Sequence, residues 1–418
     1  MSTKLQQSAG KITGAGTLYN RMLAGFGTLI FGFLLRRLMA GLEEGSIRFL
    51  LPYGRELECR ASKTGPNAIL HFSSYAGVFR LCFGGYMGLG EGYINSDWDT
   101  PSLRTLFKFG IANQEGLKSK LAGNIFAKIL RKVLRHFQRN SKSGSRRNIA
   151  HHYDLGNAFY ELWLDPSMTY SSALFDKTDV SLEDAQRAKY RRIVEKLDIQ
   201  PHHRILEIGC GWGGFAEYIA ETTGATVTGI TISQEQHEYA VNRIVEAGLQ
   251  DKANIELLDY REVTGQFDRI VSIEMLEAVG EEYWPDYFRI LSESLAPDGE
   301  AMVQVIVVPD HRFENYRRKS DFIQRHIFPG GMLLSPGEIK KQTYSAGLNV
   351  EDTFHFGASY GETLDRWYDK FIENWAAVEG LGFDDRFRRL WEYYLNYTAA
   401  GFHAGTIDVG QFLFTKSR

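Results

Sequence analysis

The stretch Arg204-Ile-Leu-Glu-Ile-Gly-Cys-Gly-Trp-Gly-Gly214 decides the fold of this chain. Its first part, Ile205 to Ile208, is a short apolar run of the kind expected for a parallel strand buried on both faces. Gly209, Gly211 and Gly213 follow at alternate positions, and a helix start follows them. Because glycine has no Cβ, a ligand can approach the backbone closely there, so the stretch predicts a nucleotide-binding loop.

Two classes of nucleotide site share such a loop. Gly209, Gly211 and Gly214 also fit the dinucleotide pattern G-x-G-x-x-G, which expects an acid at the end of the second strand. The second strand, Ala225 to Ile232, ends without one, and an acid stands instead at Glu207, before the first glycine. The pattern E-x-G-x-G-x-G resembles the first motif of S-adenosylmethionine-dependent methyltransferases, which favours that cofactor over NAD.

Length and composition indicate two domains of ordinary polarity. The chain has 418 residues, 44% of them hydrophobic, and a net charge of -3. A chain this long exceeds one typical core, and we place the boundary between residues 1–145 and 146–418. The cysteines are scattered, at Cys59, Cys82 and Cys210, and no signal peptide precedes them, so we expect a reducing, cytoplasmic compartment and no structural zinc.

The first domain reads as a small α+β unit. The apolar stretch Met22–Leu35 is shorter than the roughly 20 residues of a spanning helix, so it predicts a helix packed on its own domain or lying on a bilayer. Strands are predicted at 47–51, 69–72 and 78–83, turns at 52–54 and 64–66, a break at 84–90 and a helix start at 99–103.

A basic amphipathic stretch follows. Its apolar residues recur at helical spacing from Leu117 to Phe137, and ten Lys and Arg residues lie between Glu115 and Asp154 without one carboxylate. Since a solvated helix face normally mixes both signs, the stretch predicts attraction to an anionic membrane surface. Nucleic acid is not expected, because no aromatic residues interleave with the cations. Ser141–Ser145 reads as the linker between the domains.

The second domain reads as a doubly wound parallel α/β sheet of the methyltransferase type, with Rossmann-like alternation. Besides the first two strands, strands are predicted at 254–258, 267–273 and 301–308, helices at 185–197 and 234–246, and an added edge strand at 411–415. The adjacent His151 and His152 are not expected to bind a metal, because neighbouring side chains diverge and no third ligand lies nearby.

Seven segments follow one another in this half: HHYDLGNAFY (151–160), TYSSALF (169–175), LEIGCGWGG (206–214), GITISQEQ (229–236), FDRIVSIEMLEAVG (267–280), HIFPGG (326–331) and FGASYGETL (356–364). In order and spacing they resemble the cyclopropane-fatty-acyl-phospholipid synthase family. The residues before them also resemble the N-terminal domain of bacterial members. The resemblance implies transfer of a methylene group from S-adenosylmethionine to a cis double bond of an acyl chain in a membrane phospholipid, giving a cyclopropane fatty acid.

The resemblance also implies a bicarbonate ion as the base that removes a proton from the added methyl group. The matching positions for its site are Ser172, Glu277, Gln304, Tyr360 and the backbone of Ile306. Ser172 stands where relatives have Cys, and Gln304 where they have His. Both can donate hydrogen bonds to an oxyanion. These departures concern ring closure, so release of a methylated chain whose ring has not closed stays an alternative product. A lipid-binding protein without catalysis stays an alternative function.

By the same matching, S-adenosylmethionine is expected to contact ten residues: Tyr170, Ser171, Gly209, Gly211, Trp212, Gly213, Thr231, Gln236, Asp259 and Tyr260. For the acyl chain, residues 321–328 and 367–375 are candidates that could equally be plain core. The expected partners are an unsaturated phospholipid and an anionic membrane, placing the protein peripherally on the inner face of the plasma membrane. A monomer and a homodimer both stay open.

Overall fold

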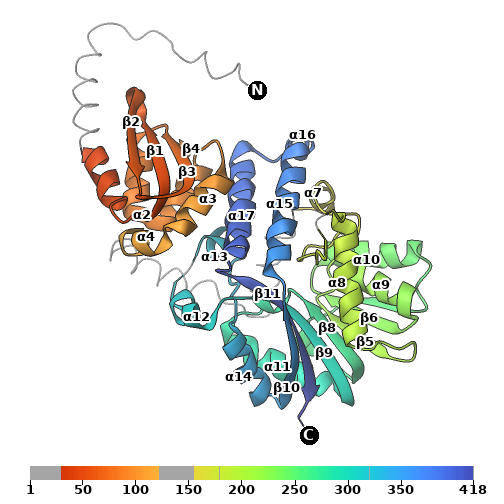
Figure 1. Ribbon diagram of the computed structural model, residues 1–418. Helices are drawn as coiled ribbons and strands as arrows, with labels where there is room; N and C mark the ends of the chain where they lie inside the picture. The colour runs from red at the N-terminus through yellow and green to blue at the C-terminus, as the bar shows by residue number, and fades with distance from the viewer. Residues whose placement is uncertain (1–29, 122–154, 178, 320, 418) are drawn as a thin grey trace. The chain divides into compact units, whose positions relative to one another are not determined.

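The computed structural model describes residues 30–121, 155–177, 179–319 and 321–417. The chain divides into two compact units, Met1–Lys128 and Ile129–Arg418, which are described separately (Figure 1). The predicted domain boundary at residue 145, the basic stretch beyond Leu121, the linker and the His pair at 151–152 lie outside the described residues.

The first unit is a four-stranded sheet with helices. Its strand order is β2-β1-β3-β4, in which β1 pairs antiparallel with β2 and parallel with β3. The core side of β1 and β3 is made by side chains such as Phe49 and Phe72, both almost fully buried. The elements are β1 (Glu44–Leu51), β2 (Arg55–Arg60), β3 (Lys63–Phe72), α2 (Tyr75–Ile94), β4 (Trp98–Asp99), α3 (Leu103–Ala112) and α4 (Gln114–Leu121).

Three predictions for this unit are wrong, and β2 was not predicted. Residues 78–83, predicted as a strand, belong to α2, which continues through the predicted break at 84–90 with a kink at Gly85. Val78 and Leu81 are buried at helical spacing, and packing of that face overrides the local alternation. Residues 64–66, predicted as a turn, lie in β3, where a bulge beside Gly45 accommodates the close approach of Pro66.

The second unit is the expected α/β sheet of seven strands, in the order β10-β11-β9-β8-β5-β6-β7. The five strands from β9 to β7 run parallel, as predicted. The strands are β5 (Arg204–Ile208), β6 (Thr226–Thr231), β7 (Ala253–Leu257), β8 (Phe267–Ile273), β9 (Leu295–Val307), β10 (Leu348–His355) and β11 (Asp408–Lys416).

The last strand corrects one prediction. β11 does not add to the edge of the sheet but lies antiparallel between β9 and β10. Its side chains therefore need apolar neighbours on both faces: Phe412 and Phe414 are almost fully buried, in one core cluster, and Leu413 packs against the other. The place of edge strand is taken by β10, in which only Leu348 is buried and the other residues alternate between half-buried and exposed, as suits an edge.

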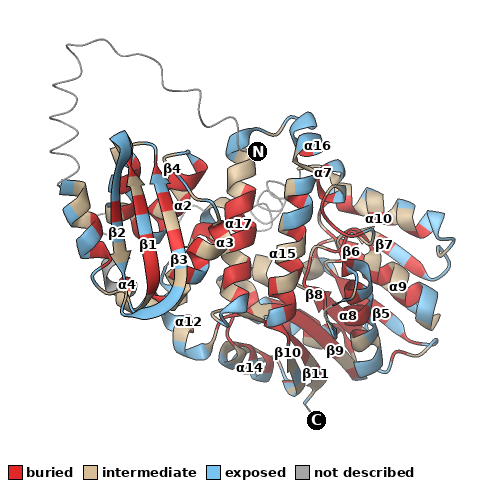
Figure 2. Ribbon diagram, turned by 45° about the horizontal axis from the view of Figure 1, so that its top comes forward, coloured by how far each residue is buried: buried red, intermediate tan, exposed pale blue. Residues whose placement is uncertain are grey.

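Helices cover both faces of this sheet, which leaves its strands buried (Figure 2). One core cluster packs between the sheet and α11, and the other between the sheet and α8, α9 and α10. The helices are α7 (Asn157–Glu161), α8 (Leu182–Lys196), α9 (Gly214–Thr223), α10 (Gln234–Glu246), α11 (Trp284–Ser294), α12 (Asp310–Arg317), α13 (Phe322–His326), α14 (Pro336–Ser345), α15 (Gly357–Glu373), α16 (Trp375–Gly380) and α17 (Asp385–His403).

The apolar stretch near the N-terminus is described only from Ile30, where residues 30–38 are helical, with Leu35 buried and Phe33 exposed. Within the described ranges, no helix has both the length and the apolar character needed to cross a membrane.

Two helix glycines of the first unit give a matched test of its packing. A Cβ on Gly116 would overlap the backbone carbonyl of Gly41, whereas a Cβ on Gly110 would meet open space. Gly110→Ala should therefore raise stability by up to about 1 kcal/mol through helix propensity. Gly116→Ala should lower it by about 1–3 kcal/mol through overpacking. Thermal unfolding of the two variants checks this, and equal effects of both would contradict the packing.

Candidate active site

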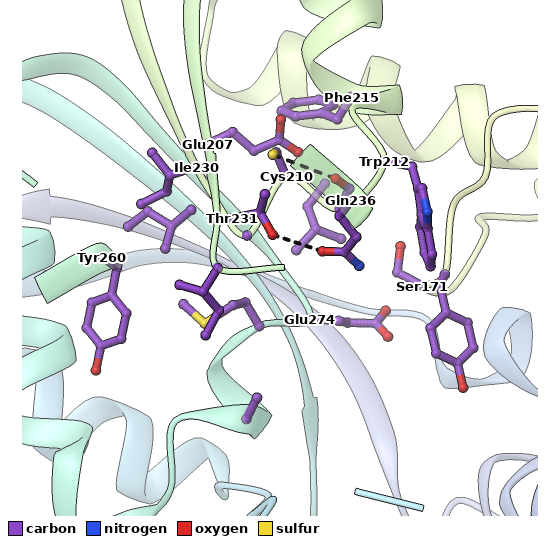
Figure 3. Close-up of a pocket in the computed structure, with 18 of the residues that line it drawn as sticks. Ser171, Glu207, Cys210, Trp212, Phe215, Ile230, Thr231, Gln236, Tyr260 and Glu274 are labelled. Atoms are coloured by element: carbon purple, nitrogen blue, oxygen red, sulfur yellow. Dashed lines mark hydrogen bonds between the residues drawn. The ribbon is translucent and has the colours of Figure 1, made fainter. Parts of the chain in front are cut away.

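A cavity of about 210 Å³ lies at the carboxyl ends of β5, β6 and β8 in the second unit (Figure 3). This is the edge of an open parallel sheet at which ligands bind. Nine of the ten residues predicted to contact the cofactor line it: Tyr170, Ser171, Gly209, Gly211, Trp212, Thr231, Gln236, Asp259 and Tyr260. The fold thus gathers segments that are up to 90 residues apart in the sequence.

The three glycines of the loop are required for two different reasons. Gly209 and Gly213 both have positive φ, and a Cβ at either would press against a neighbour, Met275 or Ala240 respectively. These two glycines permit close packing. Gly209 also lines the cavity, whereas Gly213 is the one predicted residue that does not. Gly211 also has positive φ, but a Cβ there would meet nothing within 4 Å. It is the position where a ligand can approach the backbone.

The wall next to β6 carries Thr231 and Gln236. The Thr231 hydroxyl donates to the Gln236 side-chain oxygen at 2.9 Å (Figure 3), and Ser233 caps α10 by accepting from the Gln236 backbone N–H. With its oxygen engaged, the Gln236 amide keeps its two N–H groups for an acceptor. Such a donor pair suits hydroxyl groups of a ribose, the role that the sequence predicts for these residues.

Asp259 and Tyr260 form the next part of the wall. The Asp259 carboxylate is 1% exposed and accepts two hydrogen bonds from the Arg261 guanidinium, at 2.8 and 2.6 Å. Because this bidentate pair fixes the turn that follows β7, it also fixes the position of the Tyr260 ring on the cavity.

Glu207 faces the cavity from β5 and is 2% exposed. Its Oε2 has no hydrogen-bond partner among the described residues. Burial raises the pKa of Glu207 to about 8, although the positive charge of Lys189 opposes this. A buried acid with an unused oxygen beside a cavity fits a ligand that brings a positive charge or an N–H donor.

A buried lysine that was not predicted supports the floor of the cavity. The Lys189 ammonium group on α8 is fully buried and donates to the Ser171 hydroxyl at 2.7 Å and to the Gln186 side-chain oxygen at 2.6 Å. Burial lowers the pKa of Lys189 to about 7, while the charges of Glu274, Asp165 and Glu207 oppose this. Lys189 thus places Ser171 and contributes a positive potential to an otherwise acidic site.

The aromatic side of the cavity is held by polar anchors. The Trp212 indole N–H donates to Asn157 at 2.7 Å, and the Tyr170 and Tyr394 hydroxyls lie 2.8 Å apart. The Tyr170 ring packs against the fully buried Trp367. Of the two candidate acyl-chain segments, residues 321–328 reach the cavity wall at Phe328, and residues 367–375 do not line it.

Three of the five predicted catalytic residues converge on a residue that was not predicted, Glu274, directly after β8. Its Oε1 accepts from the backbone N–H of Ser172 at 2.9 Å and from the Gln304 amide at 2.8 Å. Its Oε2 accepts from the Tyr360 hydroxyl at 2.6 Å. The Ser172 hydroxyl donates elsewhere, to the carbonyl of Ala173. Burial raises the pKa of Glu274, while the three donors and Lys189 work against that rise.

Glu277 lies on the same wall, one turn further along the chain. Its Oε1 accepts from the backbone N–H of Ile306 at 2.6 Å, and its Oε2 has no partner among the described residues. Burial and then the charge of Glu274 raise the pKa of Glu277 to about 8. Of the two neighbouring carboxyl groups, Glu274 has the donors that favour the charged form, and Glu277 is the one to stay protonated near neutral pH.

The sequence holds signals for both unpredicted residues. Gln186 and Lys189 interrupt the apolar face of a helix at positions where Ala185, Ala188 and Ile193 are buried. Glu274 directly follows a buried strand at the ligand-binding edge of the sheet. Its φ of +52° could not be foreseen, because a non-glycine residue in that region depends on its surroundings.

Comparisons with known proteins agree with this site. The mycolic acid cyclopropane synthetase family matches residues 140–412. The chain is 36% identical to tuberculostearic acid methyltransferase of Mycobacterium tuberculosis, over 79% of either chain. It is also 36% identical to cyclopropane-fatty-acyl-phospholipid synthase of Escherichia coli, over 79% of this chain and 84% of that one. A mycolic acid cyclopropane synthase solved with SAH and CTAB is 29% identical, with a TM-score of 0.61 over 65% of this chain and 98% of that one.

The open space at Gly211 gives a direct test of the cofactor loop. Gly211→Val would project a side chain into the cavity, so binding of S-adenosylhomocysteine should weaken by at least roughly 100-fold, as expected when a ligand is displaced from a tight site. Gly248→Val is the matched control, because Gly248 also has positive φ and open space but does not line the cavity. Calorimetric titration measures both. Equal weakening by the two variants would show that backbone strain alone is responsible.

The raised pKa of Glu277 predicts a pH-dependent stability. In the folded state Glu277 keeps its proton up to about pH 8, whereas in the unfolded state it releases the proton above the usual pKa of 4.5. Glu277 therefore contributes stability that is lost as pH rises through about 8. Relative to the wild type, Glu277→Gln should therefore gain stability as the pH rises from about 4.5 to about 8, and should keep that gain at higher pH. Thermal unfolding across this range measures it, with the exposed Glu246→Gln as control. Parallel pH profiles of Glu277→Gln and the wild type would contradict a protonated Glu277.

Proposed function

Because the chain belongs to the mycolic acid cyclopropane synthetase family, we propose that it modifies the cis double bond of an unsaturated acyl chain in a membrane phospholipid. The carbon comes from S-adenosylmethionine, and the product is a cyclopropane fatty acid. The observation that carries the proposal is the cavity itself, which is lined by both a glycine loop and a pair of buried carboxyl groups, Glu274 and Glu277. A lipid-binding protein without catalysis would not need this arrangement.

The residues present fit S-adenosylmethionine. When bound, it supplies an electrophilic methyl group on a positively charged sulfonium. Glu207 offers an unused carboxylate oxygen to a cationic ligand group, Gln236 offers two N–H groups, and Gly211 offers free backbone space. No comparable acid stands at the end of β6, where a dinucleotide site would require one.

An alkene is a weak nucleophile, so the chain must hold its double bond in line and keep water from the developing carbocation. The aromatic side of the cavity, with Tyr170, Trp212 and Phe328, supports both tasks. The Glu274 carboxylate, which lines the same cavity, supplies negative potential and a proton acceptor. These residues form a site that can complete the reaction after the carbon has been transferred.

The runner-up product is a methylated chain whose ring has not closed. The replacements at Ser172 and Gln304 keep it open, and one relative bears the name of a methyltransferase. Mass spectrometry of phospholipids from cells that express the chain distinguishes the outcomes. We expect the parent mass to increase by one CH2 unit, with a ring resistant to mild hydrogenation. A CH2 increase that hydrogenates readily supports the runner-up, and unchanged lipids at normal expression would refute both.

We also propose that residues 1–145 engage the membrane, and that the protein attaches peripherally to the inner face of the plasma membrane. The proposal rests on the sequence between Lys118 and Arg147, with its ten cations and no acid. The predicted catalytic residues all come from 146–418, so this proposal gives the first domain the separate task of binding the surface that holds the lipid substrate.

Charge reversal tests the membrane proposal. Each basic residue near an anionic bilayer contributes about 1 kcal/mol, screened by salt. Reversing Arg131, Lys132 and Arg135 to Glu should therefore weaken binding to vesicles containing anionic lipid far more than binding to neutral vesicles. Reversal of three exposed basic residues outside this stretch, Arg187, Arg191 and Arg204, provides a control of equal charge. Equal loss of vesicle binding in the two variants would show that net charge alone causes the effect.

A further inference from the structure

Bicarbonate, the base that the family resemblance implies, does not fit this chain as the predicted site stands. Three of the groups expected to hold it, on Ser172, Gln304 and Tyr360, already contact the carboxylate of Glu274. We propose that the Glu274 carboxylate is a built-in catalytic base, which takes the place of a bound bicarbonate ion. This inference rests on the proposed function and concerns its second step.

The contacts have the chemistry of an anion site. The Ser172 group is a backbone N–H, which can only donate, and the Tyr360 hydroxyl donates to the other carboxylate oxygen. A carboxylate and a bicarbonate ion both present two oxygens on one planar carbon. The same set of donors therefore accepts either group, but it cannot serve both at once.

A chain of hydrogen bonds fixes the direction of the third donor. The Arg192 guanidinium can only donate, and it donates to the Gln411 side-chain oxygen at 2.6 Å. The Gln411 amide then donates to the Gln304 oxygen at 3.0 Å, which leaves the Gln304 amide nitrogen to donate to Glu274. The chain runs from α8 through β11 to β9. Turning both amide groups over would point the Gln411 N–H groups at the Arg192 guanidinium, which cannot accept a hydrogen bond. Gln304 is thus set to hold an anion.

The backbone of Glu274 is a second, independent observation. Its φ is +52°, the left-handed region that favours glycine, and its N–H donates to the Gln304 carbonyl at 2.8 Å. A side chain is kept here although glycine would relieve the strain. Such outliers concentrate at functional sites, where the surrounding structure holds them in place.

The position of Glu274 suits a base. Its side chain lines the cavity together with Ser171 and Glu277, as Figure 3 shows for Glu274 and Ser171. The charged groups that face it are Lys189 from α8 and Glu277 from the loop after β8. The positive charge of Lys189 favours the ionised form of Glu274. A protonated Glu277 is neutral and therefore does not compete with Glu274 for that charge.

The step balances as follows. The π electron pair of the alkene forms a bond to the methyl carbon, and the sulfur keeps the electrons of the broken S–C bond, leaving a cation on the second alkene carbon. Glu274 then accepts a proton from the new methyl group. The electron pair of that C–H bond closes the ring onto the cationic carbon. The products are the cyclopropane, S-adenosylhomocysteine and a protonated Glu274, which returns its proton to solvent.

The wild-type chain gives the first test. Cyclopropane formation is measured with S-adenosylmethionine and vesicles of unsaturated phospholipid, in buffer purged of carbon dioxide and again with added bicarbonate. We expect rates within about twofold of each other, because the base is part of the protein. A rate that falls at least roughly tenfold on purging, and recovers with bicarbonate, would overturn the assignment of Glu274 while the proposed function stands. Absence of lipid product in both buffers would instead refute the proposed function.

Two substitutions at one position sharpen the test. Glu274→Gln fills the same space without a base and should lower product formation at least roughly 100-fold in either buffer. Glu274→Gly relieves the positive φ and leaves the donors of Ser172, Gln304 and Tyr360 exposed to the cavity, so bicarbonate should raise its low rate at least roughly tenfold. Binding of S-adenosylhomocysteine, measured by calorimetry, should stay near that of the wild type in both variants.

These outcomes exclude a merely structural role. Loss of structure would weaken S-adenosylhomocysteine binding and could not be reversed by a small anion. Glu274→Gln that binds S-adenosylhomocysteine and keeps wild-type activity would overturn the assignment. A Glu274→Gly variant that is fully active without bicarbonate would also overturn the assignment. Should neither variant fold, the comparison of purged and supplemented buffer for the wild type still decides the question.

Discussion

The site depends on the burial of a carboxylate, Glu274, at the carboxyl edge of a parallel sheet. Removing a carboxylate from water costs several kcal/mol even after the protein relaxes. Each hydrogen bond to a charged group returns about 1.5–3 kcal/mol, so the three donors can offset most of this cost. The left-handed backbone adds a further cost of about 1–2 kcal/mol. A group held at this expense is expected to have a function, and the cavity beside it provides one.

The topology of the sheet supplies the donors. Inserting β11 antiparallel between β9 and β10 brings Gln411 next to Gln304, and α8 brings Arg192 to the far side of Gln411. An edge position for β11 would have left Gln304 without the partner that orients it. Lys189, three residues before Arg192 on the same helix, reaches Ser171 on the cavity side. One helix therefore sets both the orientation of the donors and part of the charge balance.

The parts of the fold that local sequence determines were predicted well. The glycine loop is a strand, a turn and a helix start within eleven residues, and α10 is found at the predicted bounds. The errors depend on distant contacts: residues 78–83 are helical because of the face they bury, and β11 is internal because β10 occupies the edge. Glu277 was predicted as the central acid from the family resemblance, whereas the role of Glu274 becomes visible only once Ser172, Gln304 and Tyr360 are brought together from three other segments.

A crystal structure of the S-adenosylhomocysteine complex, grown with bicarbonate in the solution, tests the central claim most directly. We predict that the Glu274 carboxylate stays within hydrogen-bond distance of the Ser172 N–H, the Gln304 amide and the Tyr360 hydroxyl, with no separate anion among these donors. A Glu274 side chain turned away, with a planar anion in its place on the same three donors, would contradict the account.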